Sequence, residues 1–154
     1  MDKKETKNVL IVIDIQQGFI TENTKHVVDY ITSSIDTKNY DYIISTNFVN
    51  QKDSIFVKQL CYTENMEGNG NEIPEEIIKR SDYVISKTSY SPGSELVNIL
   101  KDKNIQQATI VGIDTDGCVL STMYTVFDAG IETFVDVLGC ASSGGKKYTT
   151  ARYK

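Results

Sequence analysis

The feature that most constrains how this chain folds is a short apolar run near its start. Residues 9–15 read VLIVIDI, in which Val and Ile dominate and one aspartate precedes the last residue. Strands buried on both faces have this composition, and they occur mainly in parallel sheets covered by helices. Shorter runs follow along the chain and predict four more strands, at residues 42–46, 83–86, 108–113 and 132–137.

The segments between these runs show helical periodicity or turn composition. In residues 117–129, side chains suited to a buried face recur at helical spacing, at Val119, Thr122, Met123, Val126 and Phe127. Gly130 then predicts the end of this helix, because glycine readily adopts the left-handed conformation that follows a helix. Further helices are predicted at residues 24–35, 54–60, 74–79 and 95–103, with a final short one within residues 142–154.

Two of the predicted helices begin next to side chains suited to capping. Asn23 or Thr24 precedes the first, and Ser94 precedes the helix at residues 95–103. The alternation of strands and helices predicts a three-layer α/β/α fold with a doubly wound parallel sheet. No repeat or linker divides residues 1–154, so a single domain is expected.

The amino-acid composition restricts the kinds of molecule that this chain is expected to bind. The 154 residues include 16 Lys and Arg against 21 Asp and Glu, which gives a net charge of −5. A chain with this balance and no basic stripe is not expected to bind nucleic acid. No apolar run approaches the roughly 18 residues of a membrane span, and the first run predicts a buried strand rather than a signal peptide. A cytoplasmic location with no membrane partner is therefore expected.

Cysteine and histidine counts restrict the chemistry further. Cys61, Cys118 and Cys140 make an odd number without an export signal, which favours free thiols in a reducing compartment. The single histidine, His26, is expected on the polar side of the first helix. A chain with one histidine cannot form a site that needs two imidazoles. Cys61 opens a polar loop over residues 61–73, whereas Cys140 follows the last predicted strand.

Three reactive side chains lie where predicted strands end, the edge at which doubly wound sheets bind ligands. Asp14 ends the first strand, Lys87 follows the third, and Cys118 follows the fourth across a tight turn. A thiol in the first turn of a helix meets unpaired N–H groups and the positive end of the helix dipole, which favour the thiolate. Each residue also has an ordinary structural interpretation, and spacing alone leaves both open.

Three sequence blocks resemble the isochorismatase-like cysteine hydrolases. The segment VGIDTDGCVLSTMYTVFDAG resembles the nucleophile motif of that family, the D-x-Q-x-x-F pattern of Asp14, Gln16 and Phe19 resembles its N-terminal motif, and YVISKTSYS resembles its lysine motif. The blocks come in the family's order and span most of the chain. The resemblance points to the amidohydrolase branch of the family.

The resemblance implies a mechanism and a set of site residues. It implies a catalytic triad of Asp14, Lys87 and Cys118, whose thiolate attacks a small amide or carbamoyl compound and leaves a thioester. It also implies a cis peptide bond between Ile113 and Asp114, with the N–H groups of Asp114 and Cys118 as the oxyanion hole. Family members commonly form dimers or tetramers, so a homo-oligomer and a small-molecule substrate are expected.

Departures from the family pattern refine these expectations. The nicotinamidase branch binds a metal after the second strand, where this chain reads STNFVNQKD, with Asn47 in place of an acid and no histidine. No metal and no cofactor are therefore expected. The lysine motif continues into a shortened loop, so the phenylalanine that usually supplies a pocket wall is either missing or replaced by Tyr90. Phe19, Tyr90 and Ile113 are expected against the substrate, and Tyr124 is a further candidate for the pocket wall.

Two other functions stay open at this point. The shortened lysine loop and the early end of the chain motivate a non-catalytic binding module of the same fold, which a Cys118 pKa at or above the ordinary value would favour. A receiver-type signalling domain also has an aspartate after its first strand, but it needs a second one after the third, where Lys87 stands. The enzyme hypothesis instead expects Cys118 to be alkylated faster than Cys61.

Overall fold

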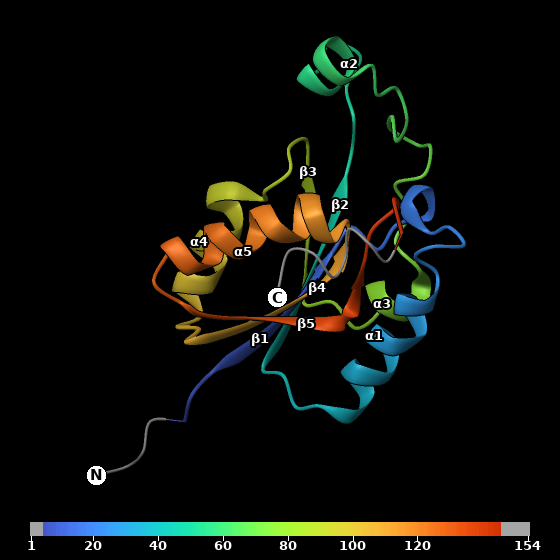
Figure 1. Cartoon of the computed structure of the whole chain (residues 1–154). Coiled ribbons are helices and arrows are strands. Elements are labelled where there is room, and N and C mark those ends of the chain that lie inside the picture. Colours follow the sequence, from blue (N-terminus) through green and yellow to red (C-terminus); the bar gives the residue numbers. More distant parts are fainter. Residues whose placement is uncertain (1–4, 146–154) are drawn as a thin grey trace.

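A five-stranded, all-parallel sheet forms the centre of the computed structural model, which describes residues 5–145. The strands follow the order β3-β2-β1-β4-β5 (Figure 1). Their bounds are β1 (Asn8–Ile13), β2 (Tyr42–Phe48), β3 (Tyr83–Lys87), β4 (Gln107–Ile113) and β5 (Glu132–Ala141). The chain winds from β1 toward β3 on one side and returns to β4 and β5 on the other, which confirms the predicted doubly wound α/β architecture.

Helices cover both faces of this sheet and make three layers. Figure 1 shows α4 and α5 on one face and α1 and α3 on the other, while α2 stands away from the sheet beyond the end of β2. The helix bounds are α1 (His26–Thr37), α2 (Ile55–Leu60), α3 (Glu75–Ile78), α4 (Gly93–Asp102) and α5 (Leu120–Asp128). None of the helices in residues 5–145 is long and apolar enough to cross a bilayer.

The apolar run at the start of the chain explains the layers. In β1, Ile11 and Ile13 pack into the cluster under α4 and α5, whereas Leu10 and Val12 pack into the cluster under α1. All four side chains are at most 1% exposed. Because successive side chains of a strand alternate between faces, a strand covered on both sides must be apolar throughout.

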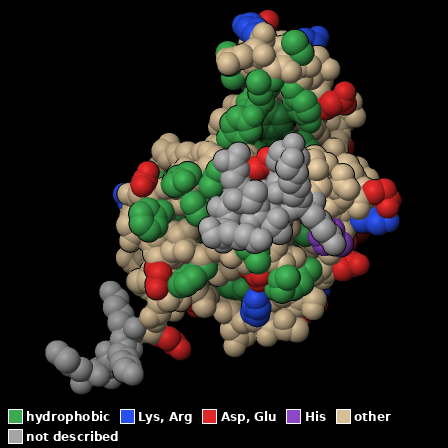
Figure 2. Space-filling model, viewed as in Figure 1, with side chains coloured by type: hydrophobic (Ala, Val, Ile, Leu, Met, Phe, Trp, Pro, Cys, Tyr) green, Lys and Arg blue, Asp and Glu red, His purple; other side chains and the backbone are tan. Residues whose placement is uncertain are grey.

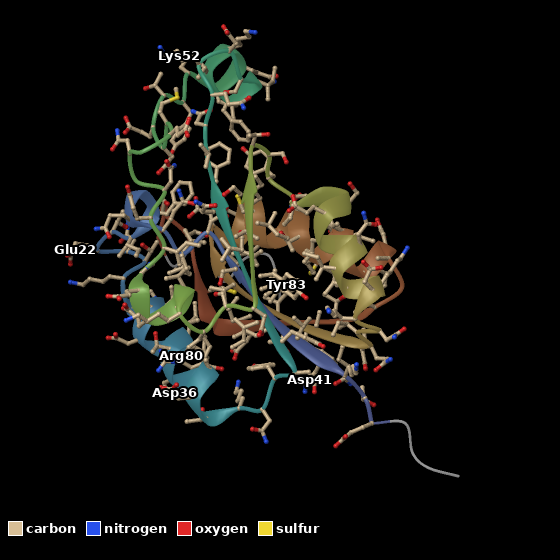
Figure 3. The ribbon with its side chains drawn as sticks, turned by 180° about the vertical axis from the view of Figure 1, so that it is seen from behind. Glu22, Asp36, Asp41, Lys52, Arg80 and Tyr83 are labelled. Carbon is tan, nitrogen blue, oxygen red and sulfur yellow. The ribbon has the colours of Figure 1, made fainter. Side chains whose placement is uncertain are left out.

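The first helix begins later than predicted. Its N-cap is Lys25, and neither Asn23 nor Thr24 caps it. The Thr24 hydroxyl instead accepts the N–H of Thr21 at 2.8 Å and donates to the carbonyl of Phe19 at 2.6 Å, so it closes the preceding turn. On this face, Arg80 forms an ion pair with Asp36 at 2.9 Å and ties the end of α3 to α1 (Figure 3).

The cap predicted for α4 is also wrong. Its N-cap is Pro92, and Ser94 lies within the helix without capping it. The hydroxyl of Ser91 accepts the N–H of Gly93 at 3.0 Å and thus performs a capping role three residues earlier.

The predicted helix at residues 117–129 divides into two elements. A π-helical turn, η2 (Thr115–Val119), precedes α5, and Phe127 is 65% exposed rather than buried. Gly130 ends the helix as predicted, with φ +80° and its N–H donated to the carbonyl of Phe127. The following strand, β5, is longer than residues 132–137, because its pairing with β4 resumes after an irregularity between Ile110 and Gly112. Most of the final helix predicted within residues 142–154 lies outside the described residues.

Gly112 allows β4 to lie against β1 beside the position of Asp14. It has φ +137°, and a Cβ built there would lie 2.1 Å from the carbonyl oxygen of Ile13. We expect Gly112→Ala to lower the free energy of unfolding by about 2–4 kcal/mol, since it adds backbone strain to overpacking. Urea denaturation measures this loss.

Gly130→Ala is the matched control. Gly130 also has a positive φ, but nothing lies within 4 Å of the added Cβ. We expect this variant to lower the free energy of unfolding by about 1–2 kcal/mol, because alanine disfavours the left-handed conformation but meets no steric clash here. Equal losses in the two variants would contradict the close approach of β4 to β1.

Candidate active site

Asp14 lies immediately beyond β1 and is completely buried. It adopts φ +50°, a conformation that aspartate tolerates better than most residues. Its Oδ1 accepts the hydroxyl of Thr46 at 2.6 Å, and its Oδ2 accepts Nζ of Lys87 at 2.7 Å. The carboxylate is therefore held from two directions by residues of β2 and β3.

Lys87 is the last residue of β3, and only 3% of its side chain is exposed. Its ammonium group donates to Asp14, to the carbonyl of Ser89 at 2.9 Å and to Sγ of Cys118 at 3.5 Å. It also lies 5.4 Å from the centre of the Phe48 ring. The charge is thus fully partnered, as a buried lysine requires.

Cys118 completes this cluster from the turn η2. Its sulfur accepts a hydrogen bond from Lys87, and the Asp14 carboxylate acts on the thiol electrostatically. Burial raises the pKa of the Cys118 thiol, the Asp14 charge raises it further, and Lys87 lowers it. Burial dominates because the residue is 8% exposed.

The raised pKa runs against the expectation of a resting thiolate. The sequence-based argument considered the helix terminus, whereas the structure adds loss of solvent and a neighbouring carboxylate. Both effects favour the neutral thiol over the thiolate.

The turn η2 is positioned by Asp114 at the end of β4. The peptide bond between Ile113 and Asp114 is cis, where the family resemblance implies one. The carbonyl of Asp114 accepts the N–H groups of Gly117 and Val119, and its carboxylate accepts both the N–H and the hydroxyl of Ser143 at 2.8 Å. Burial raises the Asp114 pKa, while the bonds from Ser143 lower it.

A cavity of about 520 Å³ opens onto Cys118. Apolar side chains gather below α2 on this side of the molecule (Figure 2). The cavity is lined by Gly18, Phe19, Thr21, Phe48, Phe56, Leu60, Tyr62, Glu64, Tyr90, Asp114, Gly117, Cys118 and Ser143. Two of the predicted substrate-binding residues, Phe19 and Tyr90, therefore lie where expected.

The third, Ile113, does not line the cavity. Its side chain is 0% exposed and packs in the core cluster under α1. Because it belongs to a strand, its side chain points into a layer of the sheet, and only its backbone reaches the edge.

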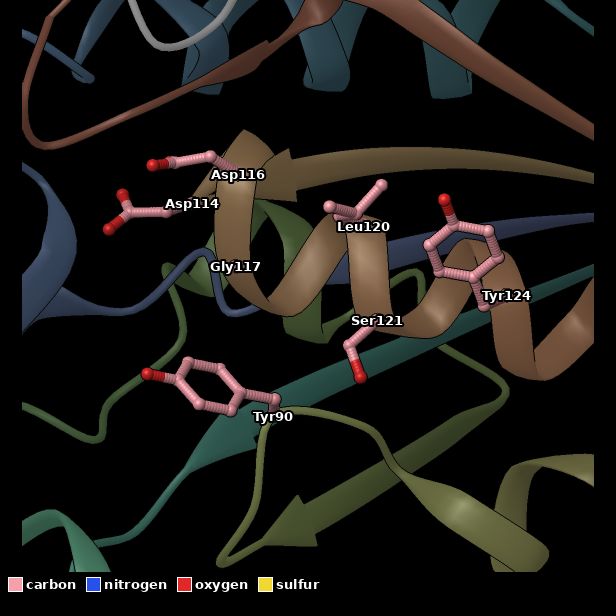
Figure 4. Close-up of a pocket in the computed structure, with 7 residues that line it drawn as sticks. All are labelled: Tyr90, Asp114, Asp116, Gly117, Leu120, Ser121 and Tyr124. Carbon is pink, nitrogen blue, oxygen red and sulfur yellow. The ribbon is translucent and has the colours of Figure 1, made fainter. Parts of the chain in front are cut away.

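A second cavity of about 460 Å³ lies beside the first and shares Tyr90, Asp114 and Gly117 with it. Figure 4 shows Tyr90 facing the turn that carries Asp114 and Asp116, with Tyr124 farther along α5. Tyr124 thus lines this second cavity and not the one at Cys118.

The segment over residues 61–73 is a wall of the cavity, although its sequence indicates only a polar loop. Asn65 is 2% exposed, and its amide donates to the hydroxyl of Tyr62 at 2.5 Å. Gln16 donates to the carbonyls of Phe48 and Gly70, both at 3.0 Å, and so ties this segment to β1 and β2. The three asparagines of the segment, Asn65, Asn69 and Asn71, were the available signal, because buried amides can form polar networks that hold a loop in place.

The donor set at the end of β2 does not fit the metal of the nicotinamidase branch. The Asn47 amide donates to the carbonyl of Asn71 at 2.9 Å and accepts the hydroxyl of Ser86 at 2.7 Å, so both of its polar atoms are used within the protein. Within residues 5–145, no group of three or more His, Cys, Asp or Glu side chains has a metal-binding arrangement.

The remaining candidates lie away from the site. His26 is exposed at the start of α1, and Cys61 is exposed at the end of α2. Cys140 is buried in the core cluster under α4 and α5 and lines neither cavity.

Comparison with known proteins decides the family. A family model described as Isochorismatase domain matches residues 8–152. The chain belongs to the isochorismatase family. Its membership in this hydrolase family argues against the receiver-domain alternative. A search of curated protein sequences gives no match.

Solved structures of isochorismatase-like proteins share the fold. N-carbamoylsarcosine amidase from Thermoplasma acidophilum aligns with a TM-score of 0.81 and 23% identity, over 93% of this chain and 88% of that chain. Nicotinamidase PncA from Bacillus subtilis aligns with a TM-score of 0.76 and 22% identity, over 94% and 92%. Nicotinamidase SaPncA from Staphylococcus aureus reaches 25% identity at a TM-score of 0.70, over 89% and 85%.

The buried pair of Asp14 and Lys87 is open to a direct test of stability. We expect Asp14→Asn to lower the free energy of unfolding by about 3–5 kcal/mol, because it leaves the Lys87 ammonium buried without a counter-charge. The double variant Asp14→Asn/Lys87→Met should recover at least half of this loss. Urea denaturation measures both, and a single variant within about 1 kcal/mol of wild type would contradict the interpretation.

The order of thiol labelling tests the state of Cys118. At pH 7.5 without substrate, we expect iodoacetamide to label the exposed Cys61 before Cys118, the reverse of the order predicted from the sequence. Because its pKa is raised, Cys118 is protonated at neutral pH, and its labelling should keep accelerating above the ordinary thiol pKa of about 8.5. Peptide mass spectrometry follows each site, and Cys61→Ser serves as the control. Faster labelling of Cys118, or a plateau below pH 8, would show that the thiol is ionised at rest.

Proposed function

We propose that this isochorismatase-family protein is a metal-independent cysteine hydrolase that cleaves a C–N bond in a small amide or carbamoyl compound. Its catalytic residues are Asp14, Lys87 and Cys118. The observation that supports the proposal is that one buried ammonium group, Lys87, donates both to the sulfur of Cys118 and to the Asp14 carboxylate where Cys118 lines a cavity. A cysteine that only packed in the core would have no need of two charged partners taken out of water.

The neutral thiol sets the order of proton transfers. Asp14 takes the thiol proton as Sγ of Cys118 bonds to the substrate carbonyl carbon. When the tetrahedral adduct collapses, the C–N bond breaks, Asp14 returns the proton to the nitrogen, and an amine or ammonia leaves a thioester. Water then attacks the thioester, Asp14 accepts its proton, and the acid product and free thiol are restored.

Lys87 stabilises the negative charge that passes between the carboxylate and the sulfur. Its contacts with Asp14 at 2.7 Å and Cys118 at 3.5 Å allow it to interact with either group. The N–H groups of Asp114 and Cys118 are the proposed oxyanion donors, each worth about 2.7–4 kcal/mol in comparable enzymes. The N–H and hydroxyl of Ser143 hold the Asp114 carboxylate and so position this turn.

The proposed chemistry assigns no step to a metal. Activation of the nucleophile and stabilisation of the oxyanion are both provided by side chains and backbone of the described residues. The amide of Asn47 is occupied by Asn71 and Ser86, which agrees with this assignment. Assembly into a homo-oligomer and a cytoplasmic location stay predictions.

A non-catalytic binding module of the same fold is the second candidate. The raised pKa of Cys118 favours it when considered alone. The Asp14 carboxylate favours the enzyme, because Lys87 holds it beside the thiol, where it can act as the base that a neutral thiol needs.

Removal of the sulfur separates these two candidates. On any amide that the wild type hydrolyses, we expect Cys118→Ala to lower ammonia or amine release by at least about 10⁴-fold while the circular dichroism spectrum is unchanged. Acid quenching during turnover should give an intact mass that includes the acyl group, attached to the peptide that contains Cys118. Cys61→Ala is the control and should keep full activity. Full activity in Cys118→Ala would refute the proposal.

A further inference from the structure

We propose that the substrate of the Cys118 cavity is a cationic amide, whose positive group lies between the aromatic wall of the cavity and the carboxylate of Glu64. This inference rests on the proposed function, because it names the class of substrate for that same site. Three observations about the cavity support it. Aromatic rings form a continuous wall, the charged residues among its described lining are acidic, and the buried Lys87 is paired with Asp14.

The aromatic wall is continuous across the cavity. Phe19 stacks on Phe48 with ring centres 6.4 Å apart, Phe48 meets the edge of Phe56 at 4.8 Å, and Phe56 meets Tyr90 at 5.0 Å. All four residues line the cavity. Ring faces carry negative potential and attract alkylammonium groups, so one such wall binds both the apolar and the charged part of a quaternary amine.

Within residues 5–145, the charged residues that line the two cavities are acidic. Glu64 and Asp114 line the Cys118 cavity, and Asp114 and Asp116 line the neighbouring cavity. Among the described residues that line either cavity, there is no lysine, arginine or histidine. A substrate with a carboxylate would meet repulsion from the described lining residues and find no cationic partner among them, whereas an ammonium group would find the carboxylates of Glu64 and Asp114.

Lys87 does not change this balance. Its ammonium lies 2.7 Å from the Asp14 carboxylate, and both side chains are almost completely buried. The pair is neutral as a unit, so among the described lining residues the net charge that a bound substrate meets comes from Glu64 and Asp114.

Glu64 is suited to pair with the substrate. Its backbone carbonyl accepts the amide of Asn50 at 3.1 Å, which fixes its place in the wall. Glu64 is an exposed residue that lines the cavity. Its charge raises the pKa of the neighbouring Tyr62, as does the charge of Asp114. A neutral alkyl group in the same place would remove water from this carboxylate without replacing its hydrogen bonds, which opposes binding.

The test compares pairs of probes with the same shape and different charge. Primary amides of trimethylammonio-substituted acetic, propanoic and butanoic acids carry one positive charge, and their tert-butyl counterparts replace the nitrogen with carbon. Binding to full-length Cys118→Ala protein is measured by calorimetry at low salt, so the result is independent of turnover. We expect the cationic member of at least one pair to bind about tenfold more tightly.

Substitutions of residues that line the cavity identify which side chains cause the preference for the cationic probe. Glu64→Gln should reduce the charge preference about threefold or more, since it removes the carboxylate and keeps the shape. Glu67→Gln is the matched control, because Glu67 is an exposed acid of the same segment that does not line either cavity. Phe56→Leu should also reduce the preference, because it removes a ring and keeps an apolar side chain.

Each outcome decides the inference separately from the proposed function. Equal binding of the two members of every pair, tighter binding of the neutral members, or no binding of any probe overturns the cationic substrate. An unchanged preference in Glu64→Gln overturns the role of that residue. The proposed hydrolase fails instead if the wild type forms no acyl adduct at Cys118 with any amide that it hydrolyses.

Discussion

The ion pair between Lys87 and Asp14 is the interaction on which the rest of the site depends. Removing two charges from water costs several kcal/mol for each ion, and the cost is offset only where every polar atom finds a partner. Here Thr46 donates a hydrogen bond to the second oxygen of the Asp14 carboxylate, while Ser89, Phe48 and Cys118 contact the Lys87 ammonium group. These partners offset the cost of burying the two charges, and they also hold both charges beside the sulfur, where the proposed reaction needs them.

The doubly wound topology makes this pair possible. Asp14 and Lys87 are 73 positions apart in the chain, and Lys87 and Cys118 are 31 apart. The parallel strands β1, β3 and β4 all end at the same edge of the sheet, so residues that follow them converge although they are distant in sequence. The close approach of β4 to β1 at Gly112 brings the Cys118 turn within reach of the pair.

A second layer of polar contacts determines the shape of the cavity. The amides of Gln16, Asn50, Asn65 and Asn71 attach the loop over residues 61–73 to the ends of β1 and β2. This attachment holds Tyr62 and Glu64 in the lining of the cavity that the aromatic wall also lines. The proposed catalytic residues therefore lie at the ends of strands or just beyond them, whereas part of the cavity lining comes from a loop held by buried amides.

The sequence by itself determined the sheet and the three residues at its edge. Continuous apolar runs identify strands buried on both faces, and Asp14, Lys87 and Cys118 stand at their ends in the order of a family motif. Only the tertiary structure decided that burial and Asp14 raise the pKa of Cys118, that Ile113 packs in the core and that Glu64 lines the cavity. The physical reason is that periodicity reports whether a side chain is buried, whereas ionisation and cavity lining depend on neighbours that are distant in sequence.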